Sequence, residues 1–502
     1  MSRFSHDARW STLVIAFLLG ACGGTTAANE SLPTTTVDAP VFDVQPIEWQ
    51  QCDDDSEPET ISCGTLEVPF DYERPNEGSF VLYIKKRSAS GVSVGPLLVN
   101  PGGPGFGGSS LANDAMYYFS KTLLDSFDII AWDPRGTGLT TPSVDCVDEY
   151  DQYFGIDSPP EDAAEREALV DAAQRFSDAC AERSGTILPY ISTIASARDM
   201  DSIRRALGVG QISYFGFSYG SELGATWATL FPDTVRAAVL DGAADPNATS
   251  IEQGLAQAKG FEQQLSAFLA QCSADELCAF HNAGNAEEAF DRLMVDIDEN
   301  PLIVARDRTP VTQGVAYTAV AQAMYSDYYW PDLEEALSDA QGGNGSGLLK
   351  LYDDYFQRRD DGSYGNELEA FLAISCLDGA DRPTVDEVDA TVDVFVDAAP
   401  RLGANFAYGY GCSLWPVEPI RPLSITGAGA GPILVIGTTG DAATPLESTR
   451  KMVAALEKGL LIVVEADQHT GYGANECVTL AVDDYLIKLV TPKRELECSS
   501  SS

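Results

Sequence analysis

Basic residues are scarce in this sequence. The 502-residue chain has 31 lysines and arginines against 76 aspartates and glutamates, which gives a formal net charge of −45 at pH 7. An acidic surface repels the phosphates of nucleic acids and the head groups of anionic lipids. We therefore expect no nucleic-acid partner. Solvation explains the charge more simply than attraction of cationic substrates does.

Histidine is rarer still, with only His6, His281 and His469 in the whole chain. No two cysteines stand in a C-x-x-C spacing and no cysteine lies in a cluster with histidines, so the sequence offers no zinc site. The glycine-rich stretch 100–108 is not followed by the lysine that a phosphate-binding P-loop requires. We therefore predict neither a metal nor a cofactor.

Long apolar runs are missing except near the N-terminus. Arg3 and Arg9 precede an apolar run over residues 13–19, which is too short to span a bilayer as a stable helix. This arrangement is typical of a cleaved signal peptide, which we place at residues 1–21. No other segment is apolar enough to cross a membrane.

The end of that run resembles a bacterial lipobox. It reads Leu18-Leu19-Gly20-Ala21-Cys22, so Cys22 is expected to carry lipid and to become the mature N-terminus. The alternative is ordinary cleavage and full secretion. Threonine-rich sequence follows, and residues 22–42 are expected to be a flexible tether.

Cysteine usage agrees with export. Without Cys22, ten of the 11 cysteines remain, an even number that suits disulfides in an oxidising compartment. Sequence alone does not fix the connectivity. We predict pairs of neighbours because each closes a short loop: Cys52 with Cys63, Cys146 with Cys180, Cys272 with Cys278, Cys376 with Cys412, and Cys477 with Cys498.

Apolar strand patterns and helical patterns alternate along much of the chain. Strands are expected at 65–68, 79–86, 96–100, 127–132, 211–215, 237–241, 432–437 and 460–466. Such alternation is typical of an α/β fold with a mostly parallel sheet. Between the strands expected at 237–241 and 432–437, helical patterns dominate. We therefore predict a core in two parts, 43–245 and 422–498, interrupted by a mainly helical cap at 246–421.

The pattern G-x-S-x-G occurs twice, at 91–95 and at 216–220. Only the second has an apolar strand before it and a helical pattern after it, which is the setting of a nucleophile elbow. Ser218 would then lie at a helix N-terminus, where backbone N–H groups can stabilise an oxyanion. Ser93 follows a polar stretch and no helix comes after it, so we interpret it as part of a loop.

The scarcity of histidine identifies the expected base. His6 lies in the signal peptide and His281 lies in the cap region, whereas His469 follows the strand at 460–466. Asp441 follows the strand at 432–437 and is the expected acid, because carboxyl ends of parallel strands meet at one edge of a sheet. Asp467 is the alternative acid, although a residue two positions before the base seldom has the required geometry.

An oxyanion hole needs two N–H donors. The backbone of Tyr219, directly after the nucleophile, is expected to supply one. The glycine-rich loop 100–108 is expected to supply the other. We predict Gly103, with Gly102 as the alternative.

Several motifs together resemble a known family. Pro101-Gly-Gly-Pro-Gly105 is similar to the H-G-G-P-G loop of proline iminopeptidases, with proline in place of histidine. Trp132-Asp-Pro-Arg-Gly-Thr-Gly138 resembles their D-x-R-G-x-G segment. With the elbow at 216–220, the order of motifs most resembles the exported tripeptidyl aminopeptidases of actinobacteria, which are serine peptidases with an α/β-hydrolase fold. The resemblance spans roughly residues 45–495.

The resemblance implies an exported enzyme, and together with the lipobox-like sequence we expect it to be secreted or attached to the cell surface, with lipid on Cys22 as its only membrane attachment. It implies an acyl-enzyme on Ser218 and release of single N-terminal residues or tripeptides from peptide substrates. A carboxylesterase or lipase with the same triad is the alternative. An aminopeptidase must bind an α-ammonium group, and Glu222, Asp327 and Asp378 are the candidates for that role.

Overall fold

The computed structural model describes residues 42–52, 58–379 and 381–499. The predicted signal peptide, Cys22 and nearly all of the predicted tether lie outside the described residues. The strands are, in chain order, β1 (Ile61–Pro69), β2 (Ser79–Arg87), β3 (Gly95–Asn100), β4 (Phe127–Trp132), β5 (Ile212–Phe217), β6 (Val235–Asp241), β7 (Ile433–Thr438), β8 (Gly459–Val464) and β9 (Glu495–Cys498).

These strands form one sheet in the order β1-β2-β4-β3-β5-β6-β7-β8-β9. The β1–β2 and β2–β4 pairs are antiparallel, and every pair from β4 to β9 is parallel. The mostly parallel sheet confirms the predicted α/β-hydrolase fold. It also brings the carboxyl ends of β3, β5, β6, β7 and β8 to one edge, where ligand sites of such sheets lie.

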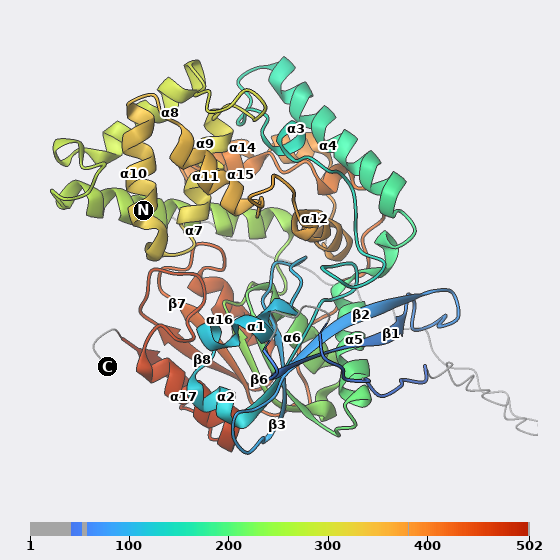
Figure 1. Cartoon of the computed structure of the whole chain (residues 1–502). Helices are drawn as coiled ribbons and strands as arrows, with labels where there is room; N and C mark the ends of the chain where they lie inside the picture. Colours follow the sequence, from blue (N-terminus) through green and yellow to red (C-terminus); the bar gives the residue numbers. More distant parts are fainter. Residues whose placement is uncertain (1–41, 53–57, 380, 500–502) are drawn as a thin grey trace, which may run out of the picture. The chain divides into compact units, whose positions relative to one another are not determined.

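Helices cover both faces of the sheet (Figure 1). Ile212 and Tyr214 of β5 belong to the apolar layer that contains α5 (Thr193–Ala206), α6 (Tyr219–Leu230) and α16 (Leu446–Ala455). Phe215 and Phe217 belong to the opposite layer, with α1 (Ser110–Tyr118), α2 (Lys121–Ser126) and α17 (Glu476–Lys488). Every residue of β5 is buried, which explains why its sequence is a continuous apolar run.

Two segments differ from the sequence-based expectation. Strand β9 was not predicted, because its sequence ELEC is charged and short. Its Cys498 is buried and bonded to Cys477 of α17. Within the region expected to be mainly helical, residues 390 and 391 separate α13 (Val385–Asp389) from α14 (Val392–Ala398), and the Thr391 hydroxyl there donates to the Val388 carbonyl.

The region predicted as a helical cap has an apolar core of its own. Five of its helices share that core: α7 (Ser250–Ala274), α8 (Ala286–Glu299), α9 (Gln313–Ala323), α10 (Trp330–Gln341) and α11 (Ser346–Tyr355). Phe268 of α7 packs edge-on against Trp330, with ring centroids 5.7 Å apart. The predicted limits of the cap at residues 246 and 421 stay a prediction.

Two earlier helices also pack with the cap. Helices α3 (Asp151–Phe154) and α4 (Ala163–Ser184) lie beside the cap helices (Figure 1). Arg308 pairs with Asp151 at 2.9 Å, and the Ser177 hydroxyl donates to the Leu414 carbonyl at 2.6 Å. These contacts link α3 and α4, which belong to the part predicted as core at 43–245, to residues of the predicted cap.

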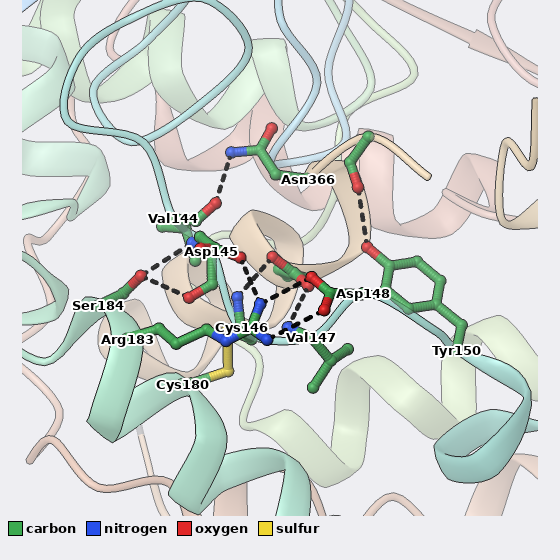
Figure 2. A network of polar contacts seen from close by, with 12 residues as sticks. Val144, Asp145, Cys146, Val147, Asp148, Tyr150, Cys180, Arg183, Ser184 and Asn366 are labelled. Carbon is green, nitrogen blue, oxygen red and sulfur yellow. Dashed lines mark hydrogen bonds and ion pairs between the residues drawn. A yellow bond between two sulfur atoms is a disulfide. The ribbon is translucent and has the colours of Figure 1, made fainter. Parts of the chain in front are cut away.

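Helix α12 (Glu367–Asp378) connects the cap region to a core loop. The side-chain amide of Asn366 donates to the carbonyls of Gly136 and Val144 at 3.0 and 2.9 Å. Buried Glu369 accepts the N–H groups of Cys146 and Val147, both at 2.9 Å. Figure 2 shows this network, in which Arg183 also bonds both Asp145 and Asp148. The first turns of α12 are thus fixed to the loop after β4.

The described residues contain five disulfides: Cys52–Cys63, Cys146–Cys180, Cys272–Cys278, Cys376–Cys412 and Cys477–Cys498. They join the same neighbours that the sequence analysis paired. Cys272, Cys278 and Glu334 are the one group among the described residues close enough to hold a metal ion. Because both sulfurs are in a disulfide, they are not thiolate ligands.

None of the helices in the described ranges has the length and apolar character needed to cross a bilayer.

Candidate active site

Ser218 lies on a sharp turn between β5 and α6. Its backbone has φ 53° and ψ −124°, a conformation that a non-glycine residue adopts only when its surroundings enforce it. Its N–H donates to the Asp241 carbonyl at 2.7 Å. A Cβ on Gly216 would lie 2.2 Å from the Gly220 carbonyl oxygen, so only glycine fits there. This is the strand–turn–helix geometry of a nucleophile elbow.

His469 and Asp441 form a bonded pair. The imidazole Nδ1 lies 2.8 Å from Oδ1 and 2.9 Å from Oδ2 of Asp441. Asp441 is buried, and it also accepts the Thr444 N–H at 2.7 Å and the Thr444 hydroxyl at 2.9 Å. The carboxylate therefore fixes Nδ1 as the protonated nitrogen and leaves the Nε2 lone pair of the neutral ring available.

The free nitrogen is directed into a closed environment. Within the described part of the chain, Nε2 of His469 is buried and has no hydrogen-bond partner. The ring Cε1 would lie 3.1 Å from a Cβ on Gly242, the residue after Asp241, which holds the Ser218 N–H. The end of β6 therefore lies against both the Ser218 turn and the His469 ring, while Nε2 and the Ser218 hydroxyl form no hydrogen bond in this structure.

The cap also contacts the histidine. The Tyr325 carbonyl accepts the His469 N–H at 2.7 Å, and the two rings pack edge-on with centroids 5.7 Å apart. This burial lowers the pKa of His469, but the Asp441 charge and hydrogen bond outweigh it, so the pKa lies above its usual value. A base with this environment holds a proton more readily than a free imidazole does.

Tyr219 and Gly103 are the two expected oxyanion donors. In the chain as described, the N–H groups of Tyr219 and Gly103 have no protein acceptor. The Gly102 N–H is occupied, because it donates to Oδ1 of Asn100 at 2.9 Å. A Cβ on Gly102 would lie 2.8 Å from the Ser218 Cβ, so this loop packs directly on the elbow. The arrangement favours Gly103 over Gly102 as the second oxyanion donor.

Two of the three expected amine-binding carboxylates lie together. Glu222 stands one helical turn after Ser218, and Asp378 is the last residue of α12. Burial raises the pKa of both groups, that of Asp378 to about 7, and repulsion from Glu222 adds to the shift at Asp378. Asp378 accepts the N–H of Thr193, the first residue of α5, at 2.8 Å. Among the described residues, neither carboxylate is in a salt bridge.

Asp327 lies elsewhere. It is exposed, in the short 3-10 turn η4 (Asp327–Tyr329). Its N–H donates to the carbonyl of Asp467 at 3.0 Å, which places it on the His469 loop rather than with Glu222 and Asp378. Asp467, the alternative acid, is exposed too, whereas the imidazole is bonded to Asp441.

The other candidate serine and histidine lie outside this site. Ser93 is in an exposed loop, and its hydroxyl donates to Asp128 at 3.0 Å. His281 bonds through Nδ1 to the Cys272 carbonyl at 3.0 Å, beside the small disulfide loop of the cap. Neither has the strand-end setting of Ser218 and His469.

Sequence reasoning missed four supporting residues: Thr444 and Thr193, which bond the carboxylates, Tyr325, which covers the histidine, and Asp241, which anchors the elbow. Asp241 carried a signal, because an aspartate at the end of a buried strand is unusual. The other three carried none, since their contacts depend on how the cap and the loops fold back on the core.

Comparisons with known proteins agree with this geometry. Residues 95–474 match the family described as alpha/beta hydrolase fold. The serine protease Hip1 of Mycobacterium tuberculosis is 33% identical over 90% of this chain and 91% of its own length. Carboxylesterase B of the same species is 34% identical over 94% of each chain. The tripeptidyl aminopeptidase of Streptomyces coelicolor is 30% identical over 90% of this chain and 86% of its own. The chain therefore belongs to the α/β-hydrolase family, as a serine hydrolase of the group that contains these peptidases and this esterase.

Proposed function

We propose that this protein is an exported serine aminopeptidase that releases N-terminal residues or tripeptides. The observation that carries the proposal is the pair of carboxylates, Glu222 and Asp378, beside the Ser218 elbow. Both are half-buried, and holding two like charges near each other without a cation is unfavourable. A substrate with a free α-ammonium group supplies the missing positive charge.

In the proposed reaction, Ser218 attacks the carbonyl carbon of the scissile bond. Nε2 of His469 takes the serine proton, while Asp441 holds the ring and stabilises the imidazolium. The N–H groups of Gly103 and Tyr219 donate to the oxyanion of the tetrahedral intermediate. His469 then gives the proton to the leaving amine, and an acyl-enzyme remains on Ser218. A water that gives its proton to His469 attacks the acyl-enzyme and regenerates the serine.

The position of the amine site explains why the enzyme would act from the N-terminus. Glu222 is four residues after the nucleophile on the same helix, about 6 Å along its axis. Asp378 comes from the cap side, on a helix whose start is fixed to the core loop. A peptide whose ammonium group binds both carboxylates places a nearby acyl carbon at Ser218.

Peptide anilides with free and N-acetylated N-termini test the proposal. We expect kcat/KM to be at least about 100-fold higher for the free amine, because a charge-assisted contact with two carboxylates is lost on acetylation. Turnover should disappear in Ser218→Ala and persist in the matched loop variant Ser93→Ala. Equal rates for free and acetylated peptides would contradict an aminopeptidase.

Carboxylate variants test the amine site separately from the triad. Glu222→Gln and Asp378→Asn should reduce kcat/KM for free-amine anilides by roughly 10-fold or more each. Hydrolysis of a short acyl ester, which has no amine, should change little in the same variants. Asp327→Asn is the matched control, since Asp327 lies apart from the pair, and it should leave both activities unchanged.

A carboxylesterase is the second candidate. It is supported by the 34% identity to a relative named carboxylesterase B, and the triad chemistry of esters and amides is shared. An enzyme of this kind would hydrolyse acyl esters far faster than free-amine anilides, and Glu222→Gln would leave its substrate preference unchanged.

We also propose that the protein acts outside the cytoplasm. Support comes from the five disulfides, which persist in oxidising compartments, and from the signal-like sequence before Cys22. In this proposal a lipid on Cys22 is the only membrane contact, and nucleic acid is not a partner. Mass spectrometry of the mature N-terminus should find lipidated Cys22, and a chain that still begins at Met1 would contradict export.

A further inference from the structure

Asp241, the last residue of β6, bonds both the turn that carries Ser218 and the loop that carries His469. Its side chain is fully buried. Oδ1 accepts the Gly471 N–H at 2.7 Å and Oδ2 accepts the Tyr472 N–H at 2.8 Å, which are both in the loop just after His469. Its carbonyl accepts the N–H of Ser218 at 2.7 Å. One residue therefore bonds the turn of the nucleophile and the loop of the base.

We propose that Asp241 is a positioning residue that sets the relative placement of Ser218 and His469. The inference rests on the proposed triad, because it concerns how two members of that triad are held. It adds a second acidic residue, distinct from Asp441, which the sequence analysis had not placed in the site.

Among the described residues, Asp241 is the carboxylate that accepts the N–H groups of Gly471 and Tyr472. Asp441 bonds Nδ1 of the imidazole and accepts the Thr470 N–H at 3.4 Å, whereas the next two N–H groups of the histidine loop, those of Gly471 and Tyr472, go to Asp241. A carboxylate has two acceptor oxygens and no donor, which matches two backbone N–H groups. An amide in the same position would present its own N–H to one of them and leave that donor unbonded.

The charge of Asp241 also faces the histidine. The ionisable groups around the His469 ring are Asp441 after β7, Asp241 at the end of β6, and Tyr325 from the cap. Burial raises the pKa of the Tyr325 phenol, so it stays neutral. Burial likewise raises the pKa of Asp241 to about 7, against the opposing effects of its two backbone bonds and of His469. When ionised, Asp241 favours the protonated imidazole.

A purely structural role is the competing explanation, and Asp133 provides the comparison. Asp133 directly follows β4 and is buried. It accepts the N–H groups of Ser109 and Leu139, both at 2.8 Å. The two aspartates thus make the same kind of backbone contacts at the same edge of the sheet. Only Asp241 is next to the histidine loop.

The test measures covalent labelling of Ser218 by a fluorophosphonate, which needs no knowledge of the natural substrate. The second-order labelling rate is followed from pH 5 to 9 for the full chain, Asp241→Asn and Asp133→Asn. We expect the plateau rate of Asp241→Asn to fall about 10- to 100-fold, as small displacements of reacting groups do. The pH at which the labelling rate of Asp241→Asn falls to half of its plateau on the acid side, its acid midpoint, should be lower than in the unmodified protein, because a negative neighbour of His469 is lost. Asp133→Asn should keep the midpoint of the unmodified protein.

Thermal unfolding controls for folding, and both variants are expected to lose similar stability since each loses one backbone acceptor. If Asp241→Asn does not fold, Asp241→Ser, which is smaller and also neutral, takes its place with the same expectation. An Asp241 variant with the plateau and midpoint of the unmodified protein would overturn the inference while the triad stands. Labelling of the unmodified protein at a residue other than Ser218 would overturn the proposed triad and the inference together.

Discussion

The acid of the candidate triad is held by more than its histidine. Asp441 accepts two hydrogen bonds from Thr444 besides the contact with Nδ1. In Asp441→Asn the amide no longer fixes the tautomer of the imidazole, so we expect kcat to fall about 10³- to 10⁴-fold with a small change in KM. Steady-state assays measure this. Asp467→Asn is the control, and a large loss there with little loss in Asp441→Asn would reverse the assignment.

The amine site predicts a pH optimum that depends on the substrate. Burial raises the pKa of Asp378 to about 7, so this carboxyl is ionised only above that value. The α-ammonium group of a peptide loses its proton near pH 8. We therefore expect kcat/KM for free-amine anilides to peak between about 7 and 8, and to fall on the acid side in parallel with loss of the carboxylate.

Acyl esters provide the comparison for that prediction, since they have no ammonium group to bind Asp378. In Asp378→Asn, the fall of kcat/KM at low pH for free-amine anilides should follow the same pH dependence as the fall for the ester. Identical profiles for the two substrates in the unmodified protein would contradict a role for Asp378 in binding the amine.

At the level of elements, α12 depends on a buried acceptor near its start. Glu369 is 2% exposed and accepts two backbone N–H groups of the core loop. Its replacement by alanine leaves both donors unpaired, at about 1–3 kcal/mol each. We expect the free energy of unfolding to fall by roughly 2 kcal/mol or more, measured by denaturant titration. Glu335→Ala, at an exposed position of α10, should change it by less than about 0.5 kcal/mol.

Disulfides of different loop length should differ in their contribution. Cys376–Cys412 closes a separation of 36 residues and Cys272–Cys278 one of six. Chain entropy assigns about 4 kcal/mol to the first and about 2 kcal/mol to the second. Paired serine replacements should follow this order in denaturant titration without reductant. The longer loop also holds the end of α12, so its loss should reduce discrimination of free from acetylated peptides, whereas loss of the shorter loop should not.

At the level of the whole molecule, the large net negative charge is the main influence on how stability depends on salt. A net charge of −45 destabilises a compact state through repulsion among its acidic groups, and salt screens that repulsion. We expect the Tm to rise by several degrees between 10 mM and 500 mM sodium chloride, and to do so with potassium chloride as well. A flat or falling Tm over this range would show that favourable surface ion pairs, such as Arg74–Glu77, outweigh the repulsion.

Periodicity and motifs predicted the parallel sheet, because its strands are buried runs of apolar residues with clear ends. The strand predicted at 127–132 matches β4 exactly as the structure has it. The same local signals selected Ser218, Asp441 and His469 as the candidate triad, since each follows a strand. Contacts formed only by tertiary folding could not be read in this way. Examples are the position of α4 with the cap and the pairing of Glu222 with Asp378, which are 156 residues apart in number and joined by no local pattern.

Helix α12 has a consequence for protein engineering. Its twelve residues contribute one carboxylate of the candidate amine site, while Ser218, Asp441 and His469 all come from other elements. Its start is anchored by Asn366 and Glu369 and its end by a disulfide. A library confined to the partly exposed positions 371, 372, 375 and 378 of this helix would therefore vary what the enzyme accepts while leaving the candidate triad, the anchors of the helix and its buried face intact. In this scaffold, substrate preference can therefore be varied separately from bond cleavage.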